Sequence, residues 1–569
     1  MPEVMPRDSD WRHMRAASGL RKDVTSSNVS EADMRHFLLL LCLVIWVPAL
    51  ASDLDNVVKI DSGYVLGSGT GVRAYKGIPF AAPPVGELRW RAPQPVKPWD
   101  SIRVSKTFSL ACPQPLLGAV PEERIGEDCL TINVWTPARA ATTRLPVLVS
   151  IPGGGFVAGS SAITLLDGER LARENVVVVS FNYRLGILGF LAHPELSKES
   201  PQAISGNYAL LDMLAALQWV QRNIAAFGGD PANVTIWGES AGGSAVGLLL
   251  VMPQASGLFH KAIMNSAWSM YYPISRLREA RATRSSAEGQ GAALGSITAL
   301  RAKSMDEVLQ LEASALSAAA GIDPDQGGQA FRPTVDGVVL PDDPAALFAR
   351  GAFHRVRLIA GSNADEGVFF APRGVTTREQ ADAWLRTQFG PEAAASLGAL
   401  YGLDSGTPVP AAIAKLTGDA LVGMGTRAIL RAAARYSPHV YQYEFTRVSP
   451  LAARMKINAF HSADLPYTFG TLPESALSSV IPGFSIRPGD YDETDERLSR
   501  AMSGAIVQFA RNGDPNGKGL PKWTRYASGG SYLVYGDSIV QKEKLRSQYL
   551  DALDGIFAAR RAPDSREPR

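Results

Sequence analysis

Gly238-Glu239-Ser240-Ala241-Gly242 lies between an apolar segment at 234–237 and a run of small residues at 241–247. The first segment is typical of a buried strand, and the run of small residues is typical of a closely packed helix. The pentapeptide therefore fits the G-x-S-x-G pattern in the strand–turn–helix setting that this pattern requires. Glycines two positions before and after the serine let the strand and helix backbones approach closely in a sharp turn. The stretch predicts a nucleophilic serine, Ser240, at the end of a strand.

Strand-like and helix-like segments alternate around this turn. Continuous apolar runs at Leu145–Ile151 and Val176–Phe181 are typical of parallel strands that are buried on both faces. Apolar residues at helical spacing follow between residues 210 and 224. The alternation predicts an α/β fold with a mostly parallel central sheet flanked by helices.

The composition is that of a folded protein with a large core, since 46% of the 569 residues are hydrophobic and 20% are charged. The 57 Lys and Arg residues and 55 Asp and Glu residues give a net charge of +2. This balance offers no electrostatic reason to expect nucleic acid or an anionic membrane as a partner. Three cysteines are too few for a cysteine-rich zinc site. Because no cluster of metal ligands appears, we expect neither a metal nor an organic cofactor.

An apolar stretch near the N-terminus predicts export. Residues 37–51 are apolar, but the stretch is shorter than the ~18 residues of a membrane-spanning helix. Arg35 precedes it, and Ala49-Leu50-Ala51 has the small-x-small form of a signal-peptidase site. We expect a secretory signal peptide cleaved after Ala51, with a membrane anchor as the alternative. The polar residues before Met34 are unusual in front of a signal peptide, so Met1 and Met34 both stay open as the start of translation.

Export changes the interpretation of the cysteines. The mature protein, residues 52–569, would be secreted or periplasmic, without a stable membrane anchor, and would retain Cys112 and Cys129. Two cysteines in an oxidising compartment with 16 residues between them predict one disulfide. A bond closing a loop of that size would stabilise the fold by about 3 kcal/mol on the chain-entropy model. The alternative is two unpaired buried thiols.

A nucleophilic serine requires a base, and the base requires an acid that orients it. In proteins with this kind of turn the chain order is serine, acid, histidine. The spacing alone does not choose among the histidines that follow Ser240, which are His260, His354, His439 and His461.

A glycine-rich turn offers a site for a negatively charged oxygen. Gly153-Gly154-Gly155 directly follows Pro152 and the predicted strand at 145–151. Consecutive glycines let backbone N–H groups point at one oxygen, and the N–H of Ala241 would complete an oxyanion hole. A flexible glycine turn without such a role is the alternative.

Taken together, these motifs resemble the type-B carboxylesterases, the family of the cholinesterases and the bacterial p-nitrobenzyl esterases. The resemblance extends over residues 60–555. Besides the serine and glycine motifs, it is carried by KGIPFAAPP at 76–84, EDCL at 127–130, NYRLG at 182–186, FGGDP at 227–231, NADEG at 363–367, FH at 460–461 and GDPN at 513–516.

The resemblance implies an α/β-hydrolase fold and a single catalytic domain. Residues 52–560 would form this domain with long insertions, in place of the three or four domains that the length alone suggests. Residues 1–51 would precede it as an N-terminal extension and signal peptide, and residues 561–569 would follow it as a disordered tail.

The resemblance also implies the remaining site residues. The family's acid, a glutamate in a D-E-G context, corresponds to Glu366, with Asp365 as the next candidate. The family's histidine corresponds to His461. Its oxyanion donors, its disulfide and an ion pair correspond to Gly154, Gly155 and Ala241, to Cys112 and Cys129, and to Arg89 and Glu127.

The sequence departs from the family at positions that bear on substrate specificity. Pro152 precedes the triple glycine, where the family often has His or Tyr. The loop from Cys112 to Cys129 contains no Trp, so a choline substrate is not expected. Aromatic residues that would line the substrate pockets by resemblance, with burial in the core as an equal alternative, are Trp268, Tyr271, Tyr272, Phe369 and Phe370.

The expected activity is hydrolysis of a small-molecule carboxylic ester through an acyl-enzyme intermediate. The chain also resembles the secreted bacterial fumonisin esterases, which remove tricarballylate side chains from a mycotoxin. A polycarboxylate would need cations in the pocket, for which Arg454 and Lys456 are candidates, with a solvated loop as the alternative. Competing hypotheses are a non-catalytic neuroligin-like binding module, a lipase and an amidase or thioesterase. The sequence carries no signal of the oligomeric state.

Overall fold

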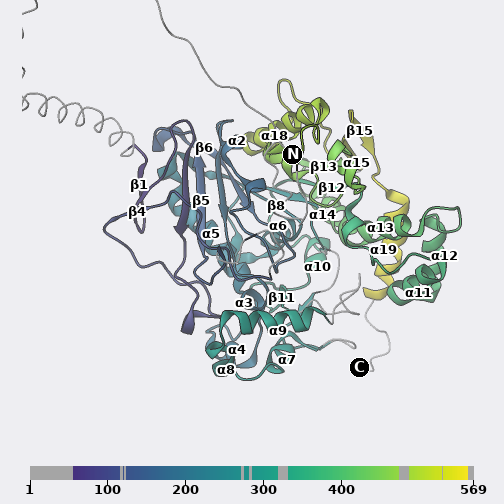
Figure 1. Cartoon of the computed structure of the whole chain (residues 1–569), viewed down its shortest axis with the longest axis horizontal. Helices are drawn as coiled ribbons and strands as arrows, with labels where there is room; N and C mark the ends of the chain where they lie inside the picture. The colour runs from purple at the N-terminus through teal and green to yellow at the C-terminus, as the bar shows by residue number, and fades with distance from the viewer. Residues whose placement is uncertain are drawn as a thin grey trace, which may run out of the picture. The chain divides into compact units, whose positions relative to one another are not determined.

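A computed structural model shows a main sheet of ten strands among the residues that it describes (Figure 1). It describes residues 55–561 except 116–119, 121–123, 269, 271–273, 281–284, 318–330, 473–485 and 528. In spatial order the strands are β15 (Ile539–Glu543), β14 (Ser531–Tyr535), β13 (Val440–Phe445), β12 (Arg357–Asn363), β9 (Lys261–Asn265), β8 (Gly229–Glu239), β6 (Leu145–Ile151), β7 (Val177–Phe181), β5 (Thr131–Thr136) and β3 (Arg73–Pro79).

Neighbouring strands from β14 to β7 are all parallel, whereas β15, β5 and β3 add antiparallel edges. Parallel strands are normally covered by helices on both faces, and this explains the continuous apolar runs in the sequence. Along β6, Val147, Val149 and Ile151 belong to one buried cluster, whereas Leu148 belongs to another. The architecture confirms the predicted α/β fold with a mostly parallel sheet.

Helices cover the two faces of the sheet. One apolar cluster joins the sheet to α5 (Tyr208–Asn223), α6 (Ala241–Val251), α10 (Pro344–Ala349) and α14 (Met424–Ala434). A second cluster joins the other face to α2 (Glu169–Ala172), α16 (Leu465–Phe469) and α18 (Glu493–Asn512). Both clusters bury long apolar rows of strand residues, which is the main favourable contribution to folding.

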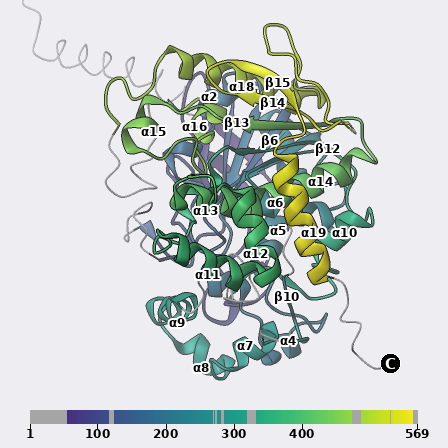
Figure 2. The same cartoon turned by 90° about the vertical axis from the view of Figure 1, so that its right-hand side faces the viewer.

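A third apolar cluster is built by helices beside the sheet, which lie together in Figures 1 and 2. Its members are α11 (Arg378–Phe389), α12 (Pro391–Leu400), α13 (Val409–Gly418), the π-helix η8 (Asp419–Gly423) and α19 (Ser547–Arg561). The other described strands and α-helices are β1 (Val57–Ile60), β2 (Gly63–Leu66), β4 (Ile102–Val104), α3 (Gly186–Phe190), α4 (Pro194–Glu199), β10 (Ser275–Arg276), α7 (Ala287–Ala292), α8 (Ile297–Ala302), α9 (Met305–Ser317), β11 (Thr334–Val335) and α15 (Pro450–Met455).

The covalent and ionic pairs expected from the sequence are present. Cys112 and Cys129 form a disulfide. Arg89 donates from Nε to Glu127 Oε2 over 2.8 Å, and its Nη2 pairs with the other carboxylate oxygen. Within the described residues, no helix combines the length and apolar character that crossing a bilayer requires.

The predicted domain boundaries are only partly covered by the described residues. Residues Asn56–Arg569 form one compact unit by their contacts. The predicted signal peptide at 1–51 lies outside the described residues, as does the predicted tail beyond Arg561.

Candidate active site

Ser240 lies in a strained turn between β8 and α6. Its backbone has φ 57° and ψ −126°, in a region that L-amino acids rarely adopt. The Ser240 N–H donates to the Asn265 carbonyl of the neighbouring strand over 3.0 Å. A Cβ atom on Gly242 would lie only 2.1 Å from the Ile151 carbonyl oxygen, so the glycine is required for this close approach. The turn therefore holds Ser240 at the carboxyl end of the sheet.

The structure brings His461 together with Glu366, across 95 residues of sequence. His461 Nδ1 lies 2.5 Å from Glu366 Oε2. The other carboxylate oxygen of Glu366 accepts hydrogen bonds from the Ser266 hydroxyl at 2.5 Å and the Asn363 N–H at 2.6 Å. Because Glu366 accepts three hydrogen bonds, its carboxylate is held in one orientation beside the imidazole.

The alternatives to these two residues are engaged elsewhere. His260 Nδ1 accepts from the Val234 N–H, and His354 Nε2 contacts the Met252 carbonyl. The Asp365 carboxylate accepts from the Ala459 N–H at 3.2 Å. Of the histidines left open by spacing, the structure brings only His461 to the carboxyl end of the sheet near Ser240.

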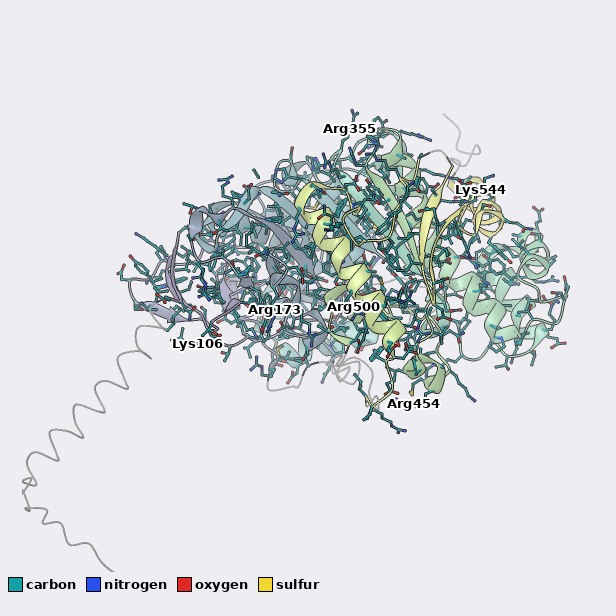
Figure 3. The ribbon with its side chains drawn as sticks, turned by 90° about the horizontal axis from the view of Figure 1, so that it is seen from above. Lys106, Arg173, Arg355, Arg454, Arg500 and Lys544 are labelled. Carbon is teal, nitrogen blue, oxygen red and sulfur yellow. A yellow bond between two sulfur atoms is a disulfide. The ribbon has the colours of Figure 1, made fainter. Side chains whose placement is uncertain are left out.

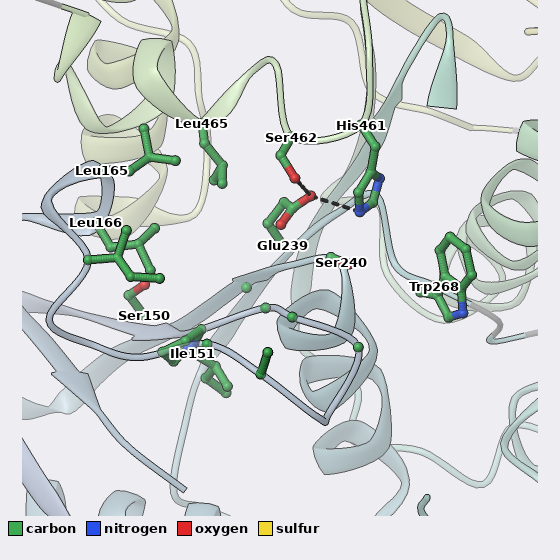
Figure 4. A pocket seen from close by; sticks show the side chains of 18 of the residues that line it. Ser150, Ile151, Leu165, Leu166, Glu239, Ser240, Trp268, His461, Ser462 and Leu465 are labelled. Carbon is green, nitrogen blue, oxygen red and sulfur yellow. Dashed lines mark hydrogen bonds and ion pairs between the residues drawn. The ribbon is translucent and has the colours of Figure 1, made fainter. Parts of the chain in front are cut away.

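A second carboxylate, that of Glu239, faces the other nitrogen of His461 (Figure 4). Glu239 Oε1 lies 3.2 Å from His461 Nε2 and accepts a 2.6 Å hydrogen bond from the Ser462 hydroxyl. Nε2 makes no hydrogen bond within the described part of the chain. Glu239 occupies the variable position of the G-x-S-x-G pattern, which is why the pattern alone did not single it out.

The two carboxylates change how the imidazole holds its proton. Burial by itself lowers the pKa of His461, but the charges of Glu239 and Glu366 outweigh it and raise this pKa to about 9. Burial raises the pKa of Glu239 to about 7, although His461 and the Ser462 hydrogen bond act in the opposite direction. The negative charges beside the imidazole therefore favour its protonated form.

The glycine turn after β6 lies beside Ser240. Gly154 has φ 109°, and a Cβ atom there would lie 2.1 Å from the Ala158 carbonyl oxygen. The Tyr183 hydroxyl donates to the Pro152 carbonyl at 2.8 Å and so anchors the start of the turn. Among the described residues, no hydrogen bond uses the N–H of Gly154, Gly155 or Ala241. These N–H groups can therefore donate to a ligand oxygen.

A cavity of about 490 Å³ opens in front of these groups (Figure 4). Ser240, His461 and the glycine turn are among the residues that line it. Trp268, Phe369 and Phe370 line it, as expected from the resemblance, and the Phe370 and His461 ring centroids lie 5.0 Å apart. Further lining residues, which sequence reasoning did not find, are Ile163, Leu165, Leu166, Arg332, Leu465 and Phe469.

Comparison with known proteins identifies the family of the chain. The model of the Carboxylesterase family matches residues 54–552. The chain belongs to the carboxylesterase family.

Named relatives of this carboxylesterase come from bacteria and mammals. It is 40% identical over 510 residues to the fumonisin B1 esterase of Sphingopyxis macrogoltabida, covering 88% of this chain and 90% of that one. It is 37% identical over 490 residues to the para-nitrobenzyl esterase of Bacillus subtilis (strain 168), covering 83% and 92%. A solved PNB esterase structure superimposes with a TM-score of 0.74 at 32% identity, covering 88% of this chain and 99% of that one. The protein is thus a carboxylic ester hydrolase with the α/β-hydrolase fold.

Two expected pocket cations of this carboxylesterase lie elsewhere. Arg454 does not line the cavity but makes a bidentate ion pair with Asp490, at 3.0 and 2.7 Å, on the surface (Figure 3). Lys456 is exposed where α15 ends and does not line the cavity either. Their proximity to His461 in sequence is misleading because α15 turns this segment outward. Tyr271 and Tyr272 lie outside the described residues.

Three polar residues around His461 that sequence reasoning missed share one property. Glu239 faces the imidazole, Ser462 donates to Glu239, and Ser266 donates to Glu366. Each of the three directly adjoins a recognised motif residue or a strand end. Inspection of such neighbours could have found them. Among the described residues, no group of three or more His, Cys, Asp and Glu side chains is arranged as a metal site.

Proposed function

We propose that this carboxylesterase cleaves esters with Ser240 as nucleophile, His461 as general base and Glu366 as the acid that orients the base. The observation that carries the proposal is the 2.5 Å contact between His461 Nδ1 and Glu366, beside a serine in a strained turn that opens on the same cavity. Such a contact fixes the ring so that Nε2 is the nitrogen directed toward the reacting groups.

The first half of the reaction forms an acyl-enzyme. His461 Nε2 takes the proton of the Ser240 hydroxyl while its oxygen attacks the ester carbonyl. In resting enzymes this contact is often long and tightens only with bound substrate, which agrees with the absence of a Ser240–His461 hydrogen bond from the described contacts. Glu366 stabilises the imidazolium, and His461 then donates its proton to the departing alcohol.

The N–H groups of Gly154, Gly155 and Ala241 stabilise the oxyanion in both halves of the reaction. They are oriented by the backbone, so they need no reorganisation when charge develops on the oxygen. In the second half, water attacks the acyl-enzyme with His461 again as the base. The apolar cavity wall excludes bulk water and strengthens these electrostatic interactions.

We further propose that the natural substrates are fumonisin-type tricarballylate esters and that the protein is secreted or periplasmic. The similarity to a protein named fumonisin B1 esterase supports the substrate class. The Cys112–Cys129 disulfide is compatible with an oxidising compartment outside the cytoplasm. The predicted signal peptide at 1–51 accounts for export.

The test is release of p-nitrophenol from p-nitrophenyl butyrate by residues 52–569 and by its Ser240→Ala variant. We expect the substitution to lower kcat by about 10⁴-fold or more. Ser256→Ala, at an exposed position after α6, is the matched control and should retain activity. Activity that survives Ser240→Ala would contradict the mechanism, and a folded but inactive wild type would favour a neuroligin-like binding module.

Two competing hypotheses that use the same triad, a lipase and an amidase, predict different rates on suitably chosen substrates. A lipase would show a jump in turnover when a long-chain ester exceeds its solubility limit. An amidase would hydrolyse an amide at a rate comparable with that of the matching ester. We expect neither result.

A further inference from the structure

Arg332 stands out in the wall of the cavity because the wall is otherwise mainly apolar and aromatic. It is the only Lys or Arg among the described residues that line this cavity. The other charged or titratable groups there, Glu239 and His461, belong to the reacting side around Ser240. The cavity therefore combines the reacting groups, an apolar wall and one permanent positive charge.

The backbone around Arg332 is tied to the core. Asn207, buried at the start of α5, bonds both to the Thr334 N–H at 3.0 Å and to the Thr334 carbonyl at 2.7 Å. The Thr334 hydroxyl donates to the Arg332 carbonyl at 3.1 Å, and Arg332 Nη1 donates to the Phe331 carbonyl at 3.2 Å. Arg332 is half-buried rather than a freely rotating surface side chain. Its position is thus set in advance, which lowers the entropy lost on binding.

The charge of Arg332 also acts on a buried carboxylate, that of Glu312. Glu312 of α9 is 1% exposed, and burial raises its pKa while the charge of Arg332 acts to lower it. Glu312 lies against Gly186, whose N–H donates to the Phe156 carbonyl directly after the glycine turn. Glu312 therefore lies beside the backbone that adjoins the glycine turn and within range of the charge of Arg332.

We infer that Arg332 binds a carboxylate carried by the substrate, so that this site selects esters bearing a free carboxylate near the scissile bond. The inference rests on the proposed ester hydrolysis at Ser240. A guanidinium binds a carboxylate through paired N–H donors, and the interaction is stronger beside an apolar wall than in water. The carboxylate can belong to the acyl group or to the alcohol, and matched substrates distinguish these two sources.

The experiment measures kcat/KM for two pairs of esters that differ only in charge. On the acyl side the pair is p-nitrophenyl hydrogen adipate and its neutral ω-amide. On the alcohol side the pair is 4-acetoxybenzoate and 4-acetoxybenzamide. The readout is the anionic-to-neutral ratio in the wild type, Arg332→Gln, Arg332→Lys and the control Lys456→Gln, whose side chain is exposed away from the cavity.

We expect the ratio for one pair to fall by about tenfold to hundredfold in Arg332→Gln, the range for a hydrogen-bonded charged group. Arg332→Lys should retain part of the preference, and Lys456→Gln should retain all of it. The pair that responds identifies the side that carries the carboxylate. A purely structural role of Arg332 would lower both members of each pair equally, and equal ratios in Arg332→Gln and wild type for both pairs would overturn the inference.

A binding measurement separates this inference from the proposed function. Ser240→Ala and Ser240→Ala/Arg332→Gln are titrated by calorimetry with p-nitrophenyl hydrogen adipate and with its neutral amide. The second substitution should raise Kd selectively for the anion by about tenfold or more. If Ser240→Ala hydrolysed esters as fast as wild type, only the mechanism would be refuted, and the anionic-to-neutral kcat/KM ratios would still test the role of Arg332. No selective change in Kd would refute the role of Arg332.

Discussion

The carboxyl end of the sheet, called the edge below, and the wall of the cavity meet at Ser240, but they are built differently. The edge consists of turns that directly follow parallel strands: Ser240 follows β8, the glycine turn follows β6 and Glu366 follows β12. The pairing of Ile151 with Gly238 and of Glu239 with Asn265 brings these strand ends together. The wall consists of residues from distant segments outside the sheet, such as Leu165, Trp268, Arg332 and Phe370.

This difference separates chemistry from selectivity. Under the proposed mechanism, the edge contacts the ester group, which all substrates share, and the wall contacts the parts of the substrate that vary. Substitutions at the edge should therefore lower the rate for every ester by a similar factor. Substitutions in the wall should instead change the ratio between esters.

After Ser240→Ala, the largest effect should come from Glu366→Gln, which removes the charge that orients and stabilises His461. We expect kcat to fall by about 10⁴-fold for every ester, as when a triad carboxylate is replaced by its amide. Steady-state kinetics with p-nitrophenyl acetate and butyrate checks this. Asp365→Asn is the control, since the Asp365 carboxylate bonds to the Ala459 N–H rather than to His461. A larger loss in Asp365→Asn than in Glu366→Gln would make Asp365 the acid.

Gly154→Ala should have the next largest effect. A Cβ atom at this position would lie 2.1 Å from the Ala158 carbonyl oxygen, and the backbone φ is 109°, so the turn must shift. Displacing one oxyanion donor typically lowers kcat by about 10²–10³-fold. Gly257→Ala carries a similar backbone strain, with φ 76° and open space around the position, and serves as the control. Comparable kcat values for the two variants, at similar Tm, would argue against an oxyanion role for this turn.

Glu239→Gln should change the pH dependence of the rate. His461 acts as a base only when deprotonated, and its pKa is raised to about 9, so kcat/KM of the wild type should rise toward pH 9. Removing the Glu239 charge removes one cause of the raised pKa and should move this rise to lower pH. A pH-stat titration with ethyl butyrate, which is stable to alkali on this timescale, measures both profiles.

Ser462→Ala is the matched control for Glu239→Gln. It removes the hydrogen bond to Glu239 but leaves the Glu239 charge in place. It should therefore shift the profile less than Glu239→Gln does. Superimposable profiles for wild type and Glu239→Gln would show that Glu239 does not set the protonation of His461.

Ser240 and the glycine turn, two parts of the edge, could be predicted from sequence because their determinants are local, whereas Glu366 required the family resemblance. Ser240 was found from the glycines around it and the strand before it. That strand was longer than its apolar segment at 234–237, since β8 begins at Gly229. The extension arises because β6 pairs with Gly229, across an irregularity in register, and such pairing is not visible in the sequence of one strand.

The base and the wall could not be predicted from local pattern. Spacing leaves four histidines as candidates for the base, and only the family resemblance selects His461, because its partner Glu366 is 95 residues away. Arg332 was missed and Arg454 was expected instead, although Arg454 pairs with Asp490 at the surface. Which loop residue faces a cavity depends on tertiary packing of distant segments, and no sequence period encodes that packing.

Phe370→Ala should have the smallest effect and provides the sharpest test of the wall. The Phe370 ring contacts both Trp268 and His461, with centroid distances of 4.3 and 5.0 Å, yet it is 38% exposed. If it lines a substrate pocket, each methylene that it buries should raise kcat/KM by up to about fourfold, and Phe370→Ala should flatten this increase.

The measurement is the slope of log kcat/KM against chain length, in one series that lengthens the acyl group and one that lengthens the alcohol. Val540→Ala, a comparably exposed apolar residue on β15, is the control and should change neither slope. A flattened slope in one series assigns Phe370 to the acyl or the alcohol pocket. An equal fall at every chain length would instead mean that Phe370 acts on His461, and the division between edge and wall would fail at the residue where the two regions touch.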